Sequence, residues 1–599
     1  MKKIKQPNIT PLWYPSASLA LTVITIAVVI TYGHTLSVPF YLDDYSSIVD
    51  NSAVTQGINL LSLWDYTKLR IIGYLSFAIN YSLHGPDPKW FHFTNIVIHI
   101  FAGFAVFLFI SALNSISLFH QQSGKIRAKI FPITVALLFV LHPLQTQAVT
   151  YIVQRLTSLT AFFYISSLPC FLYARLTEER WKQLSLFAAC FLFGSLAFFT
   201  KQNSFTLPFC ILLLDLLFFP KPFRQMIYLF LALLAILSAF WICMAFFFQM
   251  DPFSITSLSS LTRETVLLSR IEYFLTQTRV LWIYIGLFFW PAKLHFDPDI
   301  AISYTFFSSD VLISLFLHLL IIGTAVRFVR RQPLVSFGIL FFYLGHSIES
   351  GFIPIRDVYF EHRTYLPNLG LCIISGSVLT RWLPQKIGKK QAYLITCILL
   401  CILAMMTWKR NSIWDRPDEL WRDSALHAPH KARPWNELAK HLLQQGDNSG
   451  ALDIFLQTMH KSYGLNDTAP DSPKLDQPAA VNLVIAIAKK GEYEGALEVA
   501  NQLLEQYFSP LNHSRMLNNK GNILFKLERF KEAESSYEKA INLDPDNYNA
   551  IYNLGSLWAT QKKYKQAEIL LKKIPPSSPS CNKRNKILRT IQKEKEEKK

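Results

Sequence analysis

The chain has 599 residues, of which 51% are hydrophobic, 14% aromatic and only 17% charged. Soluble domains carry about 25% charged residues, so this composition excludes a disordered chain, a collagen and a simple cytosolic enzyme. The formal net charge of +18 does not by itself indicate a nucleic-acid partner, because membrane proteins concentrate Lys and Arg in their cytoplasmic loops. We expect the basic residues of this chain to face a lipid bilayer and not a nucleic acid.

Residues 1–408 are a series of apolar runs, most of them long enough to cross about 30 Å of hydrocarbon. The first run, 13–34, follows the basic sequence MKKIK, and no small-residue cleavage site comes after it. We therefore expect an uncleaved first helix with a cytoplasmic N-terminus. Further spans are predicted near 92–112, 131–149, 157–174, 184–200, 203–219, 226–248, 272–290, 309–327, 335–349, 365–381 and 391–408.

Basic loops set the expected topology, because such loops stay in the cytoplasm. They are centred on Lys125–Lys129, Arg175–Lys182, Lys221–Arg224, Arg327–Arg331 and Arg381–Lys390. Twelve simple crossings do not place all of them inside. Segment 272–290 contains Glu272, Gln277 and Arg279, so we expect it to be re-entrant or to face a cavity. Eleven crossings then place 35–90, 351–364 and the soluble C-terminal region outside.

The C-terminal region contains a repeat of 34 residues, seen when 514–547 is aligned with 548–581. The matched positions are Gly521 with Gly555, Phe530 with Tyr564, and Ala533 with Ala567. This spacing is typical of tetratricopeptide repeats. Two degenerate units precede it, around Trp435–Phe455 and Gly491–Ala496, separated by an inserted loop at 468–477. We predict a linker at 409–431, about four repeats over 432–581 that bind a protein or peptide, and a solvated basic tail at 582–599.

Two adjacent carboxylates, Asp43 and Asp44, follow the first predicted helix. They repel each other, so their pairing needs a reason. One reading is a helix cap or a solvated turn. The other is a general base for an acceptor hydroxyl or a ligand for a divalent cation. Both readings stay open on the sequence alone.

Polar side chains at membrane depth or at its edge are candidates for function, because they are costly there. His92, Asn95 and His99 form one stripe on the second helix, which is either an interhelical hydrogen-bond ladder or a cavity lining. The remaining candidates are expected at external junctions or along segment 272–290: His142, Arg155, Lys201, Gln277, Arg279, Glu361, His362, Arg363 and Tyr365. Several basic groups facing one cavity are what binding of a lipid phosphate or pyrophosphate requires.

Taken in order, these stretches resemble the membrane O-mannosyltransferases that carry tetratricopeptide repeats, and their bacterial relatives, within the C-type glycosyltransferases. The matching stretches are FYLDDYSSIVDN (40–51), FHFTNIVIHI (91–100), LHPLQTQAVTYIVQR (141–155), TKQNSFTLP (200–208), YFLTQTRV (273–280), EHRTYLPNLG (361–370) and RNSIWDRPDELWRD (410–423). The resemblance implies that Asp43 or Asp44 is the catalytic carboxylate. It also implies that Arg155, Lys201 and Arg363 contact the donor phosphate. Gln147 and Gln202 stand where the family often has Glu.

The expected architecture is all-α, a polytopic bundle of about 11–12 transmembrane helices followed by an α-solenoid. The expected activity is inverting transfer of a sugar from a polyprenyl-phosphate donor to a Ser or Thr hydroxyl of a protein, on the external face of a bacterial inner membrane. A magnesium or manganese ion at Asp43 and Asp44 is an open alternative. Two other hypotheses are an inactive, membrane-anchored scaffold for envelope assembly and a transporter. A transporter would show internal symmetry, which the two halves of 1–408 lack.

Overall fold

The computed structural model describes residues 15–116, 125–219, 268–458, 477–505, 508–575 and 580–596, together with isolated residues between 222 and 265 and at 578. Every regular element within these ranges is a helix, so the all-α prediction is confirmed. The chain divides into two compact units. The membrane unit comprises Met1–Asp44, Gly57–Phe296 and Ile300–Arg416, and the repeat unit comprises Tyr45–Gln56, Asp297–Asp299 and Pro417–Lys599.

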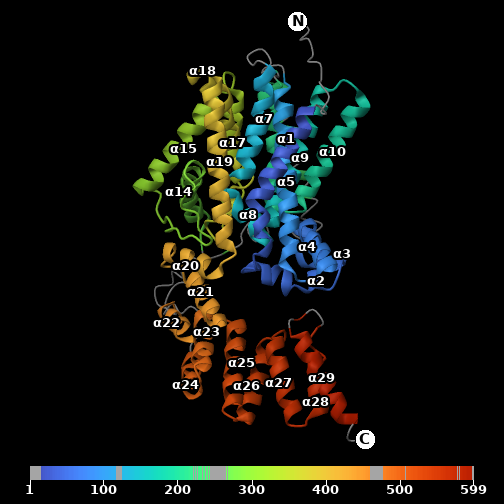
Figure 1. The fold of residues 1–599 in the computed structure, drawn as a ribbon, viewed down its shortest axis with the longest axis vertical. Coiled ribbons are helices and arrows are strands. Elements are labelled where there is room, and N and C mark those ends of the chain that lie inside the picture. The colour runs from blue at the N-terminus through green and yellow to red at the C-terminus, as the bar shows by residue number, and fades with distance from the viewer. Residues whose placement is uncertain are drawn as a thin grey trace. The chain divides into compact units, whose positions relative to one another are not determined.

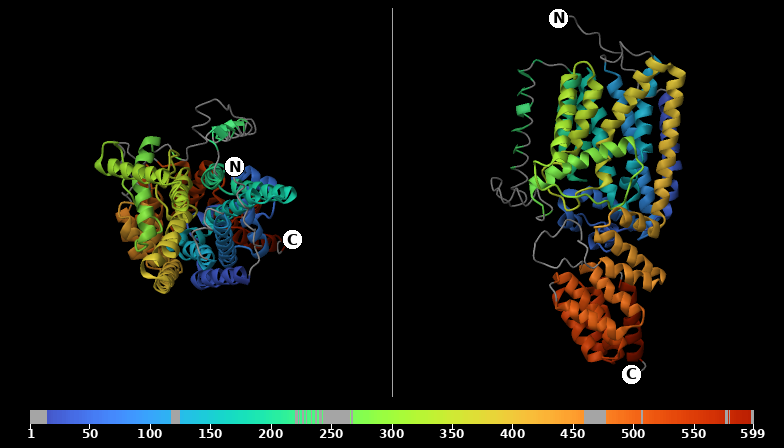
Figure 2. Two further views of the ribbon diagram at one scale, coloured as in Figure 1. Left: turned by 90° about the horizontal axis from the view of Figure 1, so that it is seen from above. Right: turned by 90° about the vertical axis from the view of Figure 1, so that its left-hand side faces the viewer.

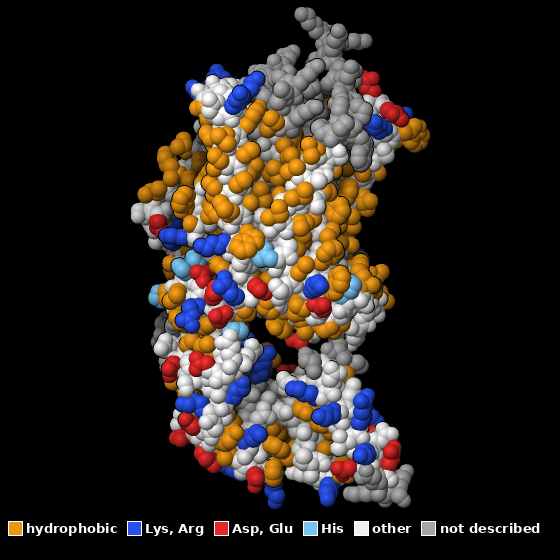
Figure 3. Space-filling model, in the orientation of Figure 1, with side chains coloured by type: hydrophobic (Ala, Val, Ile, Leu, Met, Phe, Trp, Pro, Cys, Tyr) orange, Lys and Arg blue, Asp and Glu red, His pale blue; other side chains and the backbone are white. Residues whose placement is uncertain are grey.

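Among the described residues, six helices of the membrane unit are long and apolar enough to cross a bilayer, and a bent pair, Ile130–Leu141 with Pro143–Thr150, would make a seventh. The six are α1 (Pro15–Tyr32, continued by a 3-10 turn to Ser37), α5 (Pro88–Asn114), α9 (Arg155–Leu176), α10 (Arg180–Phe198), α15 (Ser309–Arg327) and α19 (Lys389–Trp414). Large apolar side chains stay exposed along α10, α15 and α19, and few charges interrupt the hydrophobic surface over the membrane unit's helices (Figure 3). This multi-pass unit therefore presents a lipid-facing surface.

The predicted span 131–149 is not one straight helix. It consists of α7 (Lys125–Leu141) and a short helical stretch, Pro143–Thr150, which contains α8 (Thr146–Thr150), and the two parts meet at 55°. Pro143 has no N–H for the helical ladder and restricts the residue before it. His142 is accordingly extended, at φ −75° and ψ 129°. The break therefore gives α8 a different direction from α7.

Two other predicted spans correspond to short helices of the membrane unit, α11 (Leu207–Phe218) and α16 (Pro333–His346). The predicted span 365–381 falls in a longer helical run in which a π turn joins α17 (Asn368–Ser377) to α18 (Leu383–Ile387). A helix of 14 residues rises only about 21 Å, which is less than the hydrocarbon thickness. The predicted span 226–248 lies largely outside the described residues. Two further short helices, α3 (Leu60–Thr67) and α4 (Ile71–His84), follow the first span.

Segment 272–290 forms α14 (Arg270–Phe289), which is not among the helices apolar enough to cross a membrane. Ser269 and Glu272 form a capping box at its start. Figure 1 shows α14 end-on and the right-hand view of Figure 2 shows it lengthwise, so its axis runs across the bundle. Gln277 on this helix is fully buried. Both observations agree with a segment that faces the protein interior.

The C-terminal part of the repeat unit begins with α20 (Pro417–His427), and its described residues continue as four helix pairs, coloured orange to red in Figure 1. The pairs are α21 (Ala432–Gln445) with α22 (Asn448–Thr458), α23 (Gln477–Lys489) with α24 (Tyr493–Leu504), α25 (Pro510–Lys526) with α26 (Phe530–Leu543), and α27 (Tyr548–Thr560) with α28 (Tyr564–Leu571). Gly521 lets the two helices of the third pair approach closely, because a Cβ there would lie 2.5 Å from the Tyr537 ring. The predicted loop 468–477 lies almost wholly outside the described residues.

The predicted basic tail at 582–599 is helical as far as Glu596, and its residues are largely exposed except along one face. Residues Cys581–Glu596 form α29, whose Ile591 is only 2% exposed and belongs to the core of the repeats. Ile587 and Leu588 pack against the same core, and Lys595 pairs with Glu568 of α28 at 2.7 Å. Apolar residues spaced three and four apart give the basic segment one buried face. It therefore caps the last repeat, as the end of a solenoid requires.

Candidate functional site

The structure separates the roles available to the two adjacent aspartates. The Asp44 side chain is buried, and each of its oxygens accepts a backbone N–H: Oδ2 from Tyr41 at 3.0 Å and Oδ1 from Val153 at 2.7 Å. Burial raises the pKa of the Asp44 carboxyl to about 8, against the opposing effect of these two donors, and the charge of Asp43 raises it further. Asp44 therefore closes the loop onto the start of α9.

Asp43 is exposed, and its backbone N–H donates to the Tyr151 hydroxyl at 3.0 Å. The residue before it, Leu42, has φ of +37°, a strained value for a residue with a side chain. Of the two carboxylates, Asp43 is the one that a ligand can reach. The pair fits a divalent cation poorly, because such a cation needs several oxygen ligands and both Asp44 oxygens already accept N–H groups.

Arg155 is fully buried at the first residue of α9. Its guanidinium donates to the side-chain oxygens of Asn95 and Asn80, each at 2.6 Å, and to the carbonyls of Phe91 at 2.9 Å and Ser76 at 3.1 Å. These contacts use four of the five N–H donors of an arginine. Arg155 thus ties α4, α5 and α9 together beneath the Asp44 loop, and little of it remains for a ligand.

A second charged group surrounds Lys201. Its ammonium contacts the Glu349 carboxylate at 2.6 Å and the Thr157 hydroxyl at 2.9 Å, and both charged side chains are nearly buried. Burial lowers the pKa of Lys201, although the Glu349 charge opposes this. Burial alone would raise the pKa of Glu349, but Lys201, Arg363 and Arg70 hold it below its usual value. The Glu349 carboxylate therefore lies among three cations, and Asp357 is a second anion near one of them, Arg363.

Arg363 is buried in the turn Glu361–Thr364. It donates to the Tyr273 hydroxyl at 3.2 Å and to the Val358 carbonyl at 3.0 Å, and it also contacts the Asp357 carbonyl. Burial opposes its charge, but Tyr273, Tyr284 and Glu349 raise the pKa of Arg363 above its ordinary value. It stays a cation next to Glu349.

The start of α9 joins the aspartate loop to the cationic group. Val153 contacts Asp44, and Thr157, four residues later, contacts Lys201. Four residues are about one helical turn, or 6 Å along the axis. In Figure 1 the neighbouring elements α4 and α8 lie at the end of the membrane unit opposite α18, the element within the basic segment Arg381–Lys390. The backbone from Val153 to Thr157 therefore contacts both the aspartate loop and the Lys201 group.

The stripe on the second span is used in contacts between helices. His92 bonds the Val38 carbonyl at 2.9 Å, and the Asn95 amide donates to the Val149 carbonyl at 3.0 Å. His99 lies between the Tyr365 hydroxyl, at 2.7 Å, and the Val140 carbonyl, at 3.1 Å. His99 can accept from the Tyr365 hydroxyl and donate to the carbonyl, which sets its tautomer. The stripe, with Tyr365, has the contacts of an interhelical hydrogen-bond ladder.

The other predicted residues fall into two groups. The first group is buried around the turn 361–364. His142 bonds the Phe288 carbonyl at 2.8 Å, and Gln277 donates to the Val358 carbonyl at 2.8 Å. Glu361 accepts from the His295 N–H at 2.6 Å, and His362 contacts Gln147 Oε1 at 3.1 Å. Burial, with the charges of Lys201 and Arg363, holds the pKa of His362 well below its usual value. Arg279 lies apart, pairing with Asp310 at 3.0 Å.

Three residues that sequence reasoning did not select belong to this region. Glu349 pairs with Lys201, Arg70 donates to Gln202 Oε1 at 3.1 Å, and Tyr273 contacts Arg363. An acid at the very end of an apolar run, as in SIES at 347–350, is a usable signal for Glu349. Gln147 and Gln202, which replace the expected Glu, both accept hydrogen bonds here, and Gln147 also donates to the Phe296 carbonyl at 2.8 Å.

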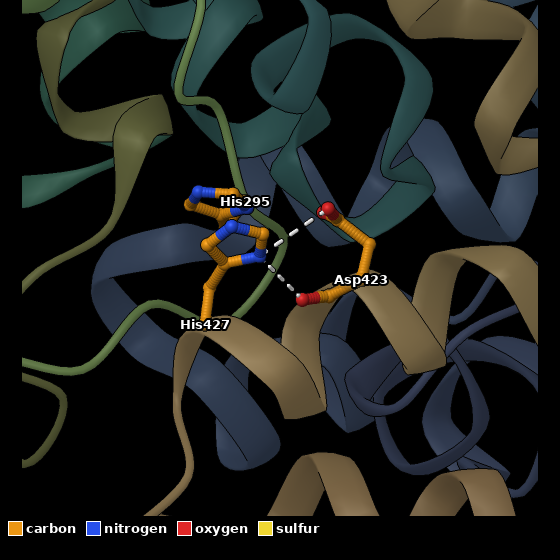
Figure 4. A group of neighbouring side chains, drawn as sticks. All are labelled: His295, Asp423 and His427. Carbon is orange, nitrogen blue, oxygen red and sulfur yellow. Dashed lines mark hydrogen bonds and ion pairs between the residues drawn. The ribbon is translucent and has the colours of Figure 1, made fainter.

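In the repeat unit, Asp423 and His427 lie one turn apart on α20. The His427 ring nitrogen Nδ1 is 3.5 Å from the Asp423 carboxylate and 2.9 Å from its carbonyl oxygen (Figure 4). One imidazole and one carboxylate on a helix are too few for a metal site. His295, also drawn in Figure 4, is part of the membrane unit.

Comparison with known proteins bears on the repeats and on the family resemblance. A family model described as a tetratricopeptide repeat matches residues 514–547, the boundaries predicted for the first clear unit. The mouse "Protein O-mannosyl-transferase TMTC3" is 22% identical over 91% of this chain and 66% of its own length. The predicted resemblance is confirmed. The human "Protein O-mannosyl-transferase TMTC1" is 25% identical over 70% of this chain and 52% of its own length. The chain spans less than two thirds of the length of both relatives.

One solved structure, titled "Crystal structure of APC/C hetero-tetramer Cut9-Hcn1", aligns with 89% of this chain and 92% of its own chain. The sequence identity is 14% and the TM-score is 0.26. A score this low carries no argument about the fold or the activity.

Proposed function

We propose that this chain is a membrane glycosyltransferase that moves a sugar, mannose in the first instance, from a polyprenyl-phosphate donor to a Ser or Thr hydroxyl of a protein. The observation that carries the proposal is an exposed carboxylate, Asp43, whose neighbour Asp44 contacts Val153, four residues before the Thr157 that contacts Lys201. The similarity to proteins named O-mannosyl-transferases supports the choice of sugar and acceptor. The match covers only 66% of the length of the mouse relative, so the activity, the donor and the acceptor are proposals for this chain.

The reaction is a single displacement at the anomeric carbon. Asp43 accepts the proton of the acceptor hydroxyl as its oxygen forms a bond to that carbon. The bond from the anomeric carbon to the phosphate oxygen breaks, and the polyprenyl phosphate leaves with the electron pair. Double displacement requires a carboxylate nucleophile as well as an acid–base group, whereas the loop offers one accessible carboxylate. Direct attack inverts the anomeric configuration.

Lys201 and Arg363 are the proposed phosphate-binding groups. Both are held on several sides by protein atoms, so little reorganisation is needed when charge develops on the leaving phosphate. Arg155 has a different proposed role, because its donors are largely used by Asn80, Asn95 and two carbonyls. It positions the start of α9, and hence the Asp44 loop and Thr157. The mechanism requires no divalent cation.

We further propose that the transferase region covers residues 1–408, followed by a linker at 409–431 and acceptor-binding repeats over 432–581. The active end of the bundle would face away from the cytoplasm, opposite the basic loops. Our proposed location is a bacterial inner membrane with the repeats in the periplasm.

Comparative glycoproteomics of external proteins tests this proposal. Cells with the native chain, cells without it and cells with Asp43→Asn/Asp44→Asn at equal protein level would be compared. Loss of the same Ser- or Thr-linked glycan from the deletion strain and the double variant is expected. If the deletion changes the envelope while the double variant keeps every glycan and behaves as native, the chain acts as a scaffold and the transferase proposal is wrong.

A further inference from the structure

A pocket in the repeat unit lies among α23, α24 and α25 and has a volume of about 260 Å³. Its accessible floor is apolar and consists of Ile485, Ala488 and Tyr493, which are half-buried. Below them lie Val484 and Ile523, which belong to the core of the repeats. The floor is therefore rigid and matches one apolar side chain.

The rim of the pocket is basic and rich in amide groups. Lys489 and Lys526 contribute ammonium groups, and none of the residues lining the pocket, all of them within the described part of the chain, is acidic. Lys489 is held in place, since its Nζ donates to the Leu443 carbonyl at 3.1 Å. Lys526 is exposed at the end of α25. A ligand with carboxylates beside its apolar group matches this charge.

Asparagine side chains continue from the pocket along the first helices of successive repeats. Asn522 Oδ1 accepts from the Tyr537 hydroxyl at 2.8 Å and from Asn553 at 2.9 Å, so its amide nitrogen is the polar group left to donate. Asn482 bonds Asn436 at 3.0 Å, and Asn553 bonds Asn518 at 2.9 Å. Amides fixed at intervals along stacked helices suit the regularly spaced carbonyls of an extended chain.

We propose that this pocket binds an extended segment of a protein, with an apolar side chain on the floor formed by Ile485 and Ala488 and acidic side chains at Lys489 and Lys526. The inference deepens the proposed function, because it names the chemistry of the acceptor segment that the repeats recruit. Binding of this segment does not depend on Asp43, so the two proposals can fail separately.

The test is fluorescence anisotropy with the full chain in lipid nanodiscs. The probe is a short fluorescein-labelled peptide with one leucine between pairs of aspartates. The control peptide has lysines in place of the aspartates. Lys526→Glu reverses one rim charge, and Ala488→Leu fills the pocket floor without changing charge. Lys531→Glu is the matched control, because Lys531 is exposed on α26, away from the pocket, and the substitution changes the net charge equally.

The acidic peptide should bind, and the basic peptide should bind at least tenfold more weakly. Lys526→Glu and Ala488→Leu should each weaken binding of the acidic peptide about tenfold, whereas Lys531→Glu should change it less than twofold. Raising the salt concentration should weaken the charged component. Asp43→Asn should bind the peptide as the native chain does.

Equal weakening by Lys526→Glu and Lys531→Glu would overturn the proposal, and so would equal binding of the two peptides. Concentration-dependent self-association that Ala488→Leu abolishes, without binding of the acidic peptide, would assign the pocket to a second copy of the chain and also overturn it. Peptide binding that follows the expected pattern in a chain without transfer activity would leave this inference standing and reject the proposed function.

Discussion

The membrane unit and the repeat unit use buried polar groups in different ways. In the membrane unit, Asp44, Arg155, Lys201 and Glu349 are buried in contacts between segments far apart in the chain. In the repeats, the core consists mainly of apolar and small residues, and close packing at positions such as Gly521 joins each helix pair. We therefore expect the membrane unit to lose most stability when a buried polar group loses its partner. We expect the repeat unit to lose most stability when the size of a side chain changes.

The largest expected effect on stability is at Arg155. Arg155→Met should reduce the stability of the membrane unit by about 3–5 kcal/mol, because it leaves buried asparagine and carbonyl partners without their donor. Arg155→Lys should not restore it, since an ammonium lacks the planar fork of donors. Thermal unfolding in detergent measures both. Arg279→Met removes a partly exposed ion pair with Asp310 and hydrogen bonds to Ala301 and Ser303, and it should cost less than Arg155→Met. An equal loss of stability in the two methionine variants would contradict the expected importance of the buried contacts.

Asp297 is an exception in the repeat unit and gives a sharper test. It is fully buried and contacts Lys431 at 2.6 Å and Arg433 at 2.5 Å. Burial alone would raise the pKa of Asp297, but the two cations lower it to about 2. A carboxyl group whose pKa is lowered in the folded state stabilises the fold at pH values above its pKa in the unfolded chain, which is near 3.9. The stabilisation, about 2–3 kcal/mol, should disappear as the pH falls from about 4 to 2.

Asp297→Asn should remove this contribution near neutral pH and flatten the pH dependence of unfolding between pH 4 and 2. The measurement is circular dichroism during denaturant unfolding at several pH values. Glu437→Gln removes an ion pair with Lys440 that is largely exposed on the lysine side, and it should change stability by less than about 1 kcal/mol. An unchanged pH profile in Asp297→Asn would show that the buried ion pairs do not stabilise this unit.

Side-chain size should dominate within the repeats. Gly521→Ala places a Cβ 2.5 Å from the Tyr537 ring, so the helix pair must separate, at a cost of about 1–3 kcal/mol. The matched control is Gly495→Ala on α24, where a Cβ meets nothing within 4 Å; that change should stabilise the helix by about 0.5–1 kcal/mol. Denaturant midpoints of the two variants should move in opposite directions, and a shift in the same direction would refute the close-packing argument.

The smallest effect concerns the turns within the helix pairs. Gly446 and Gly491 have φ of +91° and +89°, whereas Glu528 and Lys562 adopt φ of +60° and +61° at the corresponding turns. A side chain is disfavoured there, so Glu528→Gly should stabilise the unit by about 0.5 kcal/mol after the added freedom of the unfolded chain is included. Gly491→Ala should destabilise it. A loss of stability in Glu528→Gly would mean that the Glu528 side chain makes contacts that outweigh its backbone strain.

The sequence predicts the repeats better than the site, for a physical reason. The 34-residue period reports contacts between neighbouring helices, such as Gly521 with Tyr537, and the boundaries 514–547 follow directly. The helix α29 in the basic segment 582–599 is hard to predict, because the charges there outnumber the few apolar residues that form its buried face. The break after Leu141 was visible in His142-Pro143, but its angle depends on packing.

The candidate site is assembled by contacts that no local pattern contains. Asp44 meets Val153 across 109 positions, and His362 meets Gln147 across 215. Residue type and order could select Asp43, Asp44, Lys201 and Arg363 for the site. They could not show that Asp44 accepts backbone N–H groups while Asp43 is exposed, or that Glu349 is the counter-charge of Lys201.

The most direct test of the account compares Asp43→Asn with Asp44→Asn in the purified chain. Transfer of labelled mannose from polyprenyl phosphate to an acceptor peptide would be measured beside the thermal unfolding midpoint. Asp43→Asn should lower the transfer rate by about 10²–10⁴-fold while the midpoint stays within error, whereas Asp44→Asn should lower the midpoint. Near-native transfer by Asp43→Asn, or loss of transfer by Asp44→Asn at an unchanged midpoint, would contradict the assignment of the two carboxylates.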